Sequence, residues 1–170
     1  MFLVLAFILF AAFLIPRYGV TPFDEGIVLL DLRFCYTNFD VFQLFSHLGE
    51  DGREAYQFFI IYIDMFYPVI YGLGLVILLN ILIKFLGTDT RRVLWLSYLP
   101  FGIVFFDYIE NFNTLYLLNS FPLISDNAIL LGSIATAAKW IFVFLSLLIL
   151  IIIIFTLLAK YFRHVIKTKR

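Results

Sequence analysis

Four ionisable side chains lie within apolar segments of helix length, and their types could together bind a cation or move a proton. They are three acids and one base: Asp64, Asp107, Glu110 and Lys139. A charge in the hydrocarbon core costs about 2.5–3.5 kcal/mol on insertion scales, so such side chains usually face one another or a cavity. At about 1.5 Å per residue, all four fall about 14–18 Å from the expected outer ends of their helices. We therefore expect one shared site near the membrane midplane.

Neighbouring polar residues extend this candidate site along two helices. Tyr67 and Tyr71 share a helix face with Asp64 and place two phenol hydroxyls beside its carboxylate. Asn111 follows Asp107 at the i+4 position and lies on the same face of its helix. The candidate residues for binding a ligand or ion are Asp64, Tyr67, Tyr71, Asp107, Glu110, Asn111 and Lys139.

Pro68 is expected to support the site through the backbone. Proline has no N–H, and its ring displaces the carbonyl four residues earlier, which belongs to Asp64. A freed carbonyl within a membrane must find another donor. We expect that donor to be Lys139 or a bound cation.

Composition predicts the class of protein. Of the 170 residues, 64% are hydrophobic and 14% charged, whereas soluble domains are about 45–50% apolar and about 25% charged. The formal net charge of zero gives no indication of nucleic-acid binding. Cys35 is the single cysteine, which excludes an internal disulfide and a CxxC site. His47 and His164 fall outside the expected spans, so we expect neither a metal nor a cofactor.

Hydrophobic segments divide the chain into four expected spans joined by polar connections. We predict an all-α membrane protein of one domain, a four-transmembrane-helix bundle with up-down topology. The first segment is interpreted as a retained helix and not as a signal peptide, because no Lys or Arg precedes it. The spans are expected at about 2–18, 55–84, 92–119 and 127–159, with an outer loop at 19–54 and a basic tail at 160–170.

The outer loop contains a second structural signal. Thr37 and Asp40 have the spacing of a capping box, in which a hydroxyl is followed three residues later by a carboxylate. Apolar residues including Phe42 and Phe45 then recur at helical spacing, and Gly49 fits the position after a helix end. We expect an amphipathic helix at 38–48 that covers the outer mouth of the bundle.

The distribution of basic residues predicts orientation, because cytoplasmic loops are enriched in Lys and Arg. The connection at 84–92 and the tail at 160–170 together hold eight Lys and Arg residues. The loop at 16–54 holds three Arg but seven acids, and the connection at 119–127 holds no basic residue. These counts predict that both termini are cytoplasmic, in a membrane of the bacterial inner-membrane type.

Several segments resemble a small four-span bacterial membrane protein family of unassigned function. The resemblance implies the four-span architecture and a functional interest in the intramembrane acids, but no reaction. The overall layout is also similar to that of sterol-binding four-helix proteins, although the spacing of residues differs. The segments that carry the family resemblance are Phe34–Thr37, Leu48–Tyr56, Asp64–Pro68 with Tyr71, and Asp107–Asn111.

Three functions remain open at this point. One is binding or transport of a cation, a proton or a lipophilic amine or lipid in a site that opens outward. Another is a membrane-embedded lipid-modifying enzyme, with Glu110 or Asp107 as general acid or base and Lys139 stabilising negative charge. The third is a structural or accessory subunit whose buried charges only clamp the bundle. We prefer binding to catalysis, because the spans hold no activated nucleophile.

Membrane lipid is the expected partner, and the oligomeric state is left open.

Overall fold

The computed structural model describes residues 28–87 and 93–168, and every regular element among them is helical. The expected first span at 2–18 lies outside the described residues. The long helices are α2 (Asn38–Phe59), α3 (Tyr67–Phe85), α4 (Pro100–Ser120) and α5 (Asp126–Thr168). The short elements are η2 (Leu30–Leu32), η3 (Ile60–Asp64) and η5 (Leu94–Tyr98).

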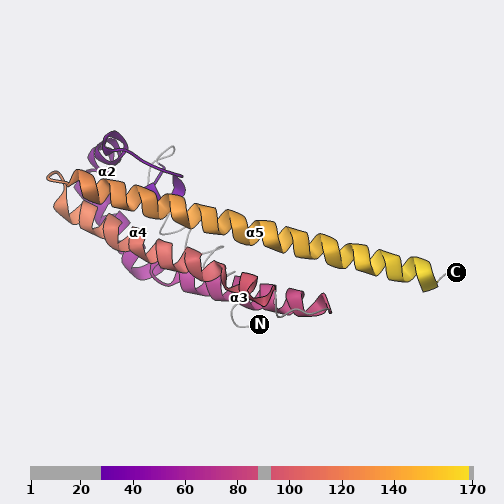
Figure 1. Cartoon of the computed structure of the whole chain (residues 1–170). Helices are drawn as coiled ribbons and strands as arrows, with labels where there is room; N and C mark the ends of the chain where they lie inside the picture. The colour runs from indigo at the N-terminus through magenta and orange to yellow at the C-terminus, as the bar shows by residue number, and fades with distance from the viewer. Residues whose placement is uncertain (1–27, 88–92, 169–170) are drawn as a thin grey trace.

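The helices α3, α4 and α5 run beside one another, and α5 is the longest (Figure 1). A tight turn joins α4 to α5, which pack along each other as an antiparallel pair. α3 packs mainly against α4 and η5 and makes fewer contacts with α5. α5 continues beyond the ends of its neighbours to the C-terminus (Figure 1).

The start of α2 follows its local sequence signals. Thr37 is the N-cap residue, and the reciprocal hydrogen bonds of a capping box join Thr37 and Asp40. Gly49 has φ 65°, a left-handed conformation that favours glycine. The helix expected at 38–48 is therefore confirmed, but the chain resumes helical structure directly after Gly49, so that this helix is the first part of α2.

The second expected span is interrupted between α2 and α3. Residues Ile60–Asp64 form a wider π-helical turn, in which the Met65 N–H donates to the Ile60 carbonyl at 2.9 Å. Pro68 lies in the first turn of α3, where its missing N–H has no intrahelical partner to lose. The helix axis is thus irregular just before Pro68, where a π-turn presents the Asp64 carbonyl to α4.

Two other expected boundaries need correction. The span at 92–119 is divided into η5 and α4, because Pro100 is suited to the first turn of a new helix. The tail at 160–170 is not separate from the fourth span, since α5 continues through residue 159 to Thr168. This stretch contains no Gly or Pro, and basic residues near a helix C-terminus interact favourably with the helix dipole.

The main hydrophobic core lies at the end of the molecule where α2, α4 and the α4–α5 turn meet. It contains the fully buried side chains of Leu30, Phe45 and Tyr56 together with Leu117 and Ile129. A smaller cluster joins α3 and α5 near the other end of the bundle. The segment 28–37, which we call the strap, contributes to the main core and is therefore more than a connecting loop.

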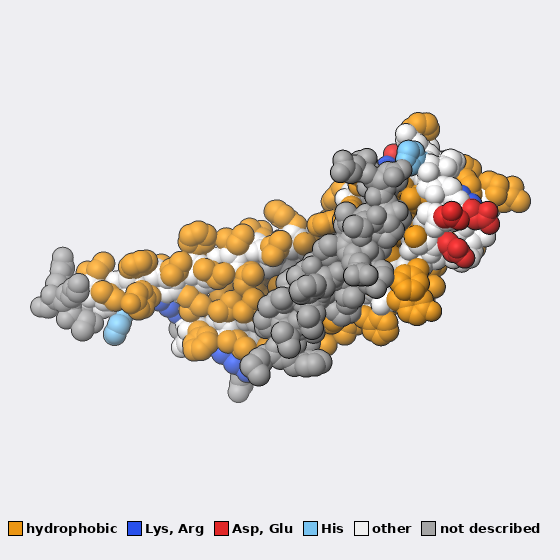
Figure 2. All heavy atoms as spheres, turned by 180° about the vertical axis from the view of Figure 1, so that it is seen from behind, with side chains coloured by type: hydrophobic (Ala, Val, Ile, Leu, Met, Phe, Trp, Pro, Cys, Tyr) orange, Lys and Arg blue, Asp and Glu red, His pale blue; other side chains and the backbone are white. Residues whose placement is uncertain are grey.

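Two continuous helical stretches among the described residues are long and apolar enough to cross a membrane. The first, Asn38–Phe85, runs through α2, η3 and α3, and the second, Asp126–Ile166, lies within α5. Only 28% and 11% of their most apolar stretches are buried within the protein, so most of these side chains face outward. Figure 2 shows a surface dominated by hydrophobic side chains, with acidic side chains gathered at one end. α4 does not qualify as a span by composition, because it carries several polar residues that the fold buries.

The contact between α3 and α4 depends on a glycine. A Cβ atom at Gly72 would overlap Val104 on α4, whereas a Cβ atom at Gly74, on the same helix, would meet nothing within 4 Å. We expect Gly72→Ala to destabilise the protein by about 1–3 kcal/mol through overpacking. Gly74→Ala is the matched control and should be neutral or stabilising, because alanine favours the helix. Thermal unfolding in detergent measures both, and equal melting temperatures would contradict the close α3–α4 contact.

Candidate functional site

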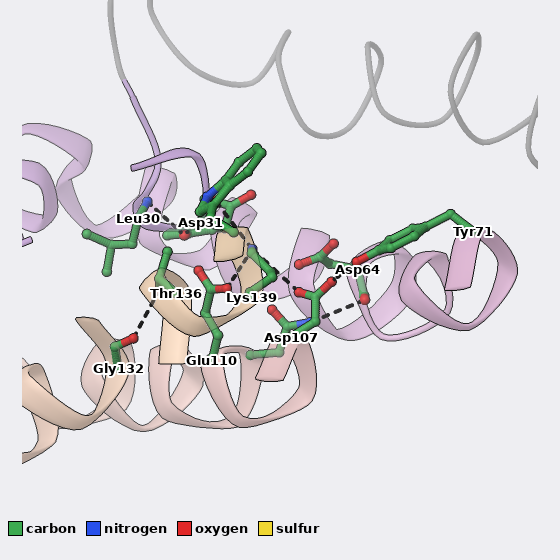
Figure 3. Close-up of polar contacts among 12 residues, drawn as sticks. Leu30, Asp31, Asp64, Tyr71, Asp107, Glu110, Gly132, Thr136 and Lys139 are labelled. Atoms are coloured by element: carbon green, nitrogen blue, oxygen red, sulfur yellow. Dashed lines mark hydrogen bonds and ion pairs between the residues drawn. The ribbon is translucent and has the colours of Figure 1, made fainter. Parts of the chain in front are cut away.

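Lys139 forms the centre of a buried ionic cluster between α4 and α5. Lys139 is 7% exposed, and its Nζ lies 2.5 Å from Oε2 of Glu110 and 3.6 Å from Oδ1 of Asp107. The two acids are one turn apart on α4 and are themselves buried. Figure 3 shows the lysine between them. Lys139 is therefore paired with carboxylates of α4, as expected for a shared site.

The predicted residues of the second span reach the same cluster from α3 and η3. The Tyr71 hydroxyl donates to Oδ2 of Asp107 at 2.5 Å. Asp64 is 9% exposed, and its carboxyl group points toward that of Asp107 (Figure 3). Tyr67 is half-buried, and its ring centroid lies 5.0 Å from that of Tyr71. The four ionisable residues singled out by depth thus converge in the interior.

The carbonyl of Asp64 has a different donor from the one expected. Nδ2 of Asn111 donates to it at 3.2 Å, and neither Lys139 nor an ion is needed for this. Asn111 lies one turn after Asp107 on the same face of α4 and reaches the π-turn, whereas the ammonium of Lys139 is held by Glu110 and Asp107. In this structure Asn111 satisfies a backbone carbonyl of the π-turn.

The strap adds an acid that sequence reasoning placed in the outer loop. The backbone carbonyl of Asp31 accepts hydrogen bonds from Nζ of Lys139 and Nε1 of Trp140, both at 3.3 Å. The Tyr56 hydroxyl donates to Oδ1 of Asp31 at 3.3 Å and accepts from the Leu30 N–H at 3.3 Å. These contacts hold Asp31 against the ionic cluster.

The other end of the strap is anchored on α5. The Tyr36 N–H donates to Oγ of Ser133 at 2.9 Å. Burial raises the pKa of the Tyr36 hydroxyl, which therefore stays protonated. A side chain at Gly132 would overlap Tyr36 and Asn113, so glycine is what allows the strap to approach α5 so closely.

Two signals could have identified the missed residues. Asp31 lies within an apolar run from Val28 to Leu32, which is a pattern of burial and not of a solvated loop. Trp140 directly follows Lys139, and adjacent helical residues do not usually face each other. Both Lys139 and Trp140 have side chains long enough to reach one carbonyl from neighbouring positions.

Acidic groups outnumber basic ones in this cluster. Among the described residues, the carboxyl groups of Asp107 and Glu110 pair with the single ammonium of Lys139, and Asp31 and Asp64 lie nearby (Figure 3). Oδ1 of Asp107 and Oε1 of Glu110 are buried, and no described residue donates a hydrogen bond to either atom. A buried charge that is not paired is costly. The cluster therefore has the capacity to accept further protons or a cationic group.

A cavity of about 700 Å³ adjoins the cluster between α3 and α5. The end of the cavity at the strap is polar and aromatic, and it includes Asp31, Lys139 and Trp140. The rest of the wall is apolar and follows α3 and α5 away from the strap. The side chains that line it are Asp31, Leu32, Tyr67, Ile70, Tyr71, Leu75, Leu78, Lys139, Trp140, Val143 and Leu147, together with Gly74.

Comparison of the chain with protein-family models, with curated proteins and with solved structures finds no match. The fold and the site therefore define the class of protein by themselves. Over residues 28–87 and 93–168 it is all-helical, with two helices long and apolar enough to cross a membrane and with a buried acid–lysine cluster beside an amphipathic cavity.

Replacement of Lys139 by an uncharged residue should destabilise the protein, because the neighbouring acids lose their counter-ion. We expect Lys139→Met to lower the free energy of unfolding by about 3–5 kcal/mol, because it leaves buried carboxylates without their cation. The double variant Lys139→Met/Glu110→Gln should recover part of this loss. Lys160→Met is the control, since Lys160 is exposed and donates to the Leu86 carbonyl at the other end of the bundle. Denaturation in detergent distinguishes these variants, and a double variant no more stable than the single one would contradict the pairing.

Proposed function

We propose that this chain is an integral membrane protein that binds an amphiphilic molecule of the membrane in the cavity between α3 and α5. The observation that carries the proposal is the composition of the cavity wall. One end is polar and adjoins the ionic cluster, and the remainder is apolar. A lipid-like molecule has the same division between a head and a tail.

The proposed topology is a four-span bundle with both termini cytoplasmic, in a membrane of the bacterial inner-membrane type. Residues 2–18 would form the first span. α4 would cross as the third, with its polar side chains turned toward the other helices, which is the usual solution for such residues within a membrane. The outward-facing apolar surface of α5 supports this arrangement.

Distances along α5 relate the cluster to the membrane. Lys139 lies 13 residues after Asp126 and 21 residues before Lys160, or about 20 Å and about 31 Å along the helix axis. With Lys160 at the cytoplasmic surface, the cluster lies in the outer half of the membrane. From Lys139 to Leu147 the cavity wall extends about 12 Å toward the cytoplasmic side. A tail in the cavity would thus point toward the membrane centre.

The cavity favours an amphiphile over a bare cation or a proton. Its volume falls within the range of about 300–1,000 Å³ that is usual for small-molecule sites, and its walls are mostly apolar. A bare ion would leave these walls without a partner. The enzymatic alternative has less support, because the ammonium of Lys139 is already paired with two carboxylates. A purely structural clamp predicts that no molecule is retained.

Native mass spectrometry of the purified protein tests the proposal. We expect a retained membrane amphiphile, and we expect Gly74→Phe to remove it, because Gly74 lines the cavity and has open space at its Cβ position. Ile81→Phe is the matched control, since Ile81 is on the same helix but exposed and outside the cavity wall. Both variants should melt within a few degrees of the wild type. Equal retention by the two variants, or no retained molecule in the wild type, would argue for a structural clamp.

Labelling with a membrane-impermeant thiol reagent tests the topology. Cys35 is the single cysteine and is exposed, so in intact cells or sealed vesicles it should react from the outer side. In a Cys35→Ser background, Ser125→Cys should react from the same side and Thr88→Cys only from the cytoplasmic side. If positions 88 and 125 react from one side, the up-down arrangement is wrong.

A further inference from the structure

The hydrogen-bond donors at the polar end of the cavity are already directed at protein acceptors. The Lys139 ammonium contacts two carboxylates and the Asp31 carbonyl. The Tyr71 hydroxyl donates to Asp107, and the Trp140 N–H donates to the Asp31 carbonyl. An anionic headgroup needs such donors for its own oxygen atoms. This end of the cavity therefore has little to offer a phosphate, sulfate or carboxylate.

The same end is well provided with groups that attract a cation. Asp31 is the only carboxylate among the described residues that line the cavity wall, and three further acids lie behind Lys139 and Tyr71 (Figure 3). Because one ammonium balances one carboxylate, the described cluster has an excess of carboxyl groups over cations. A cation that entered beside Asp31 would reduce this excess without the loss of any existing contact.

Aromatic side chains complete the polar end. Tyr67, Tyr71 and Trp140 line the same cavity as Asp31, and Trp140 contacts the Asp31 carbonyl. The faces of such rings attract ammonium groups, most strongly where water is excluded, and quaternary ammonium ligands are recognised in this way. A cavity lined by an acid and three aromatic residues thus matches a substituted ammonium better than it matches a neutral sugar or alcohol head.

We propose that the amphiphile bound in this cavity carries an ammonium headgroup, with Asp31 as its counter-ion and the side chains of Tyr67, Tyr71 and Trp140 around it. This inference rests on the proposed function and specifies the headgroup. The tail would lie against Ile70, Leu75, Leu78, Val143 and Leu147.

Three probes with the same dodecyl chain test the headgroup: dodecyltrimethylammonium, dodecanol and dodecanoate. The fluorescence of Trp140 reports binding in a Trp95→Phe background, since the chain has two tryptophans and Trp95 is exposed away from the cavity. Titrations are carried out in uncharged maltoside micelles, with affinities expressed per mole fraction in the micelle. We expect the cationic probe to bind at least about tenfold more tightly than the other two.

The variant Asp31→Asn keeps an acceptor for the Tyr56 hydroxyl but removes the charge. It should lose the preference for the cationic probe and bind dodecanol as the wild type does. Asp31→Glu should restore the preference. Asp51→Asn is the control, because Asp51 is exposed and outside the cavity wall, and it should retain the preference in full.

The outcomes separate the two proposals. If dodecanol or dodecanoate binds as tightly as the cation in the wild type, the ammonium inference is wrong and the cavity remains an amphiphile site. If Asp31→Asn keeps the full preference, Asp31 is not the counter-ion and the inference is wrong. If no probe changes the fluorescence of Trp140, the proposed function fails, and the inference fails with it. The three titrations of the wild-type protein determine which headgroup charge is preferred, even if Asp31→Asn does not fold.

Discussion

The placement of one buried ammonium determines how the end of the bundle beside the strap is assembled. Lys139 comes from α5, its carboxylate partners Glu110 and Asp107 come from α4, and the carbonyl of Asp31 comes from the strap. An unpaired ammonium in this interior would be costly, so these three elements must meet at one level. α3 joins them because the Tyr71 hydroxyl binds the same Asp107.

The cavity is a consequence of this arrangement. α4 packs closely on both α3 and α5, whereas α3 and α5 make fewer contacts with each other. The ionic cluster and the strap close one end of the space between them, and a small apolar cluster around Leu79 and Ile83 closes the other. The site therefore has a charged end and an apolar end because two different interactions hold the ends of the same helix pair.

Much of the local structure could be read from the sequence. The capping box depends only on Thr37 and Asp40, which lie within one turn of each other, and the left-handed conformation at position 49 depends on the glycine itself. The structure contains both features. The backbone irregularity before Pro68 has the same local origin. Asp64, Asp107, Glu110 and Lys139 also converge in the interior, as their matching positions along the helices indicated, because a helix converts residue number directly into distance. The sequence pattern did not show that helical structure resumes directly after Gly49 or that α5 continues past residue 159, because a glycine and a run of basic residues are both usual signs of a helix end.

The contacts between segments distant in sequence were decided by the tertiary structure alone. The donor for the Asp64 carbonyl is Asn111, which is 47 residues away, and Asp31 meets Lys139 across 108 residues. Depth along a helix does not specify the direction in which its side chains point around the axis, and a loop residue has no defined depth at all. The sequence by itself thus determined that charges must be buried and at what level. Which of them face the cavity depends on helix rotation and on the path of the strap, and both of these are set by packing between distant parts of the chain.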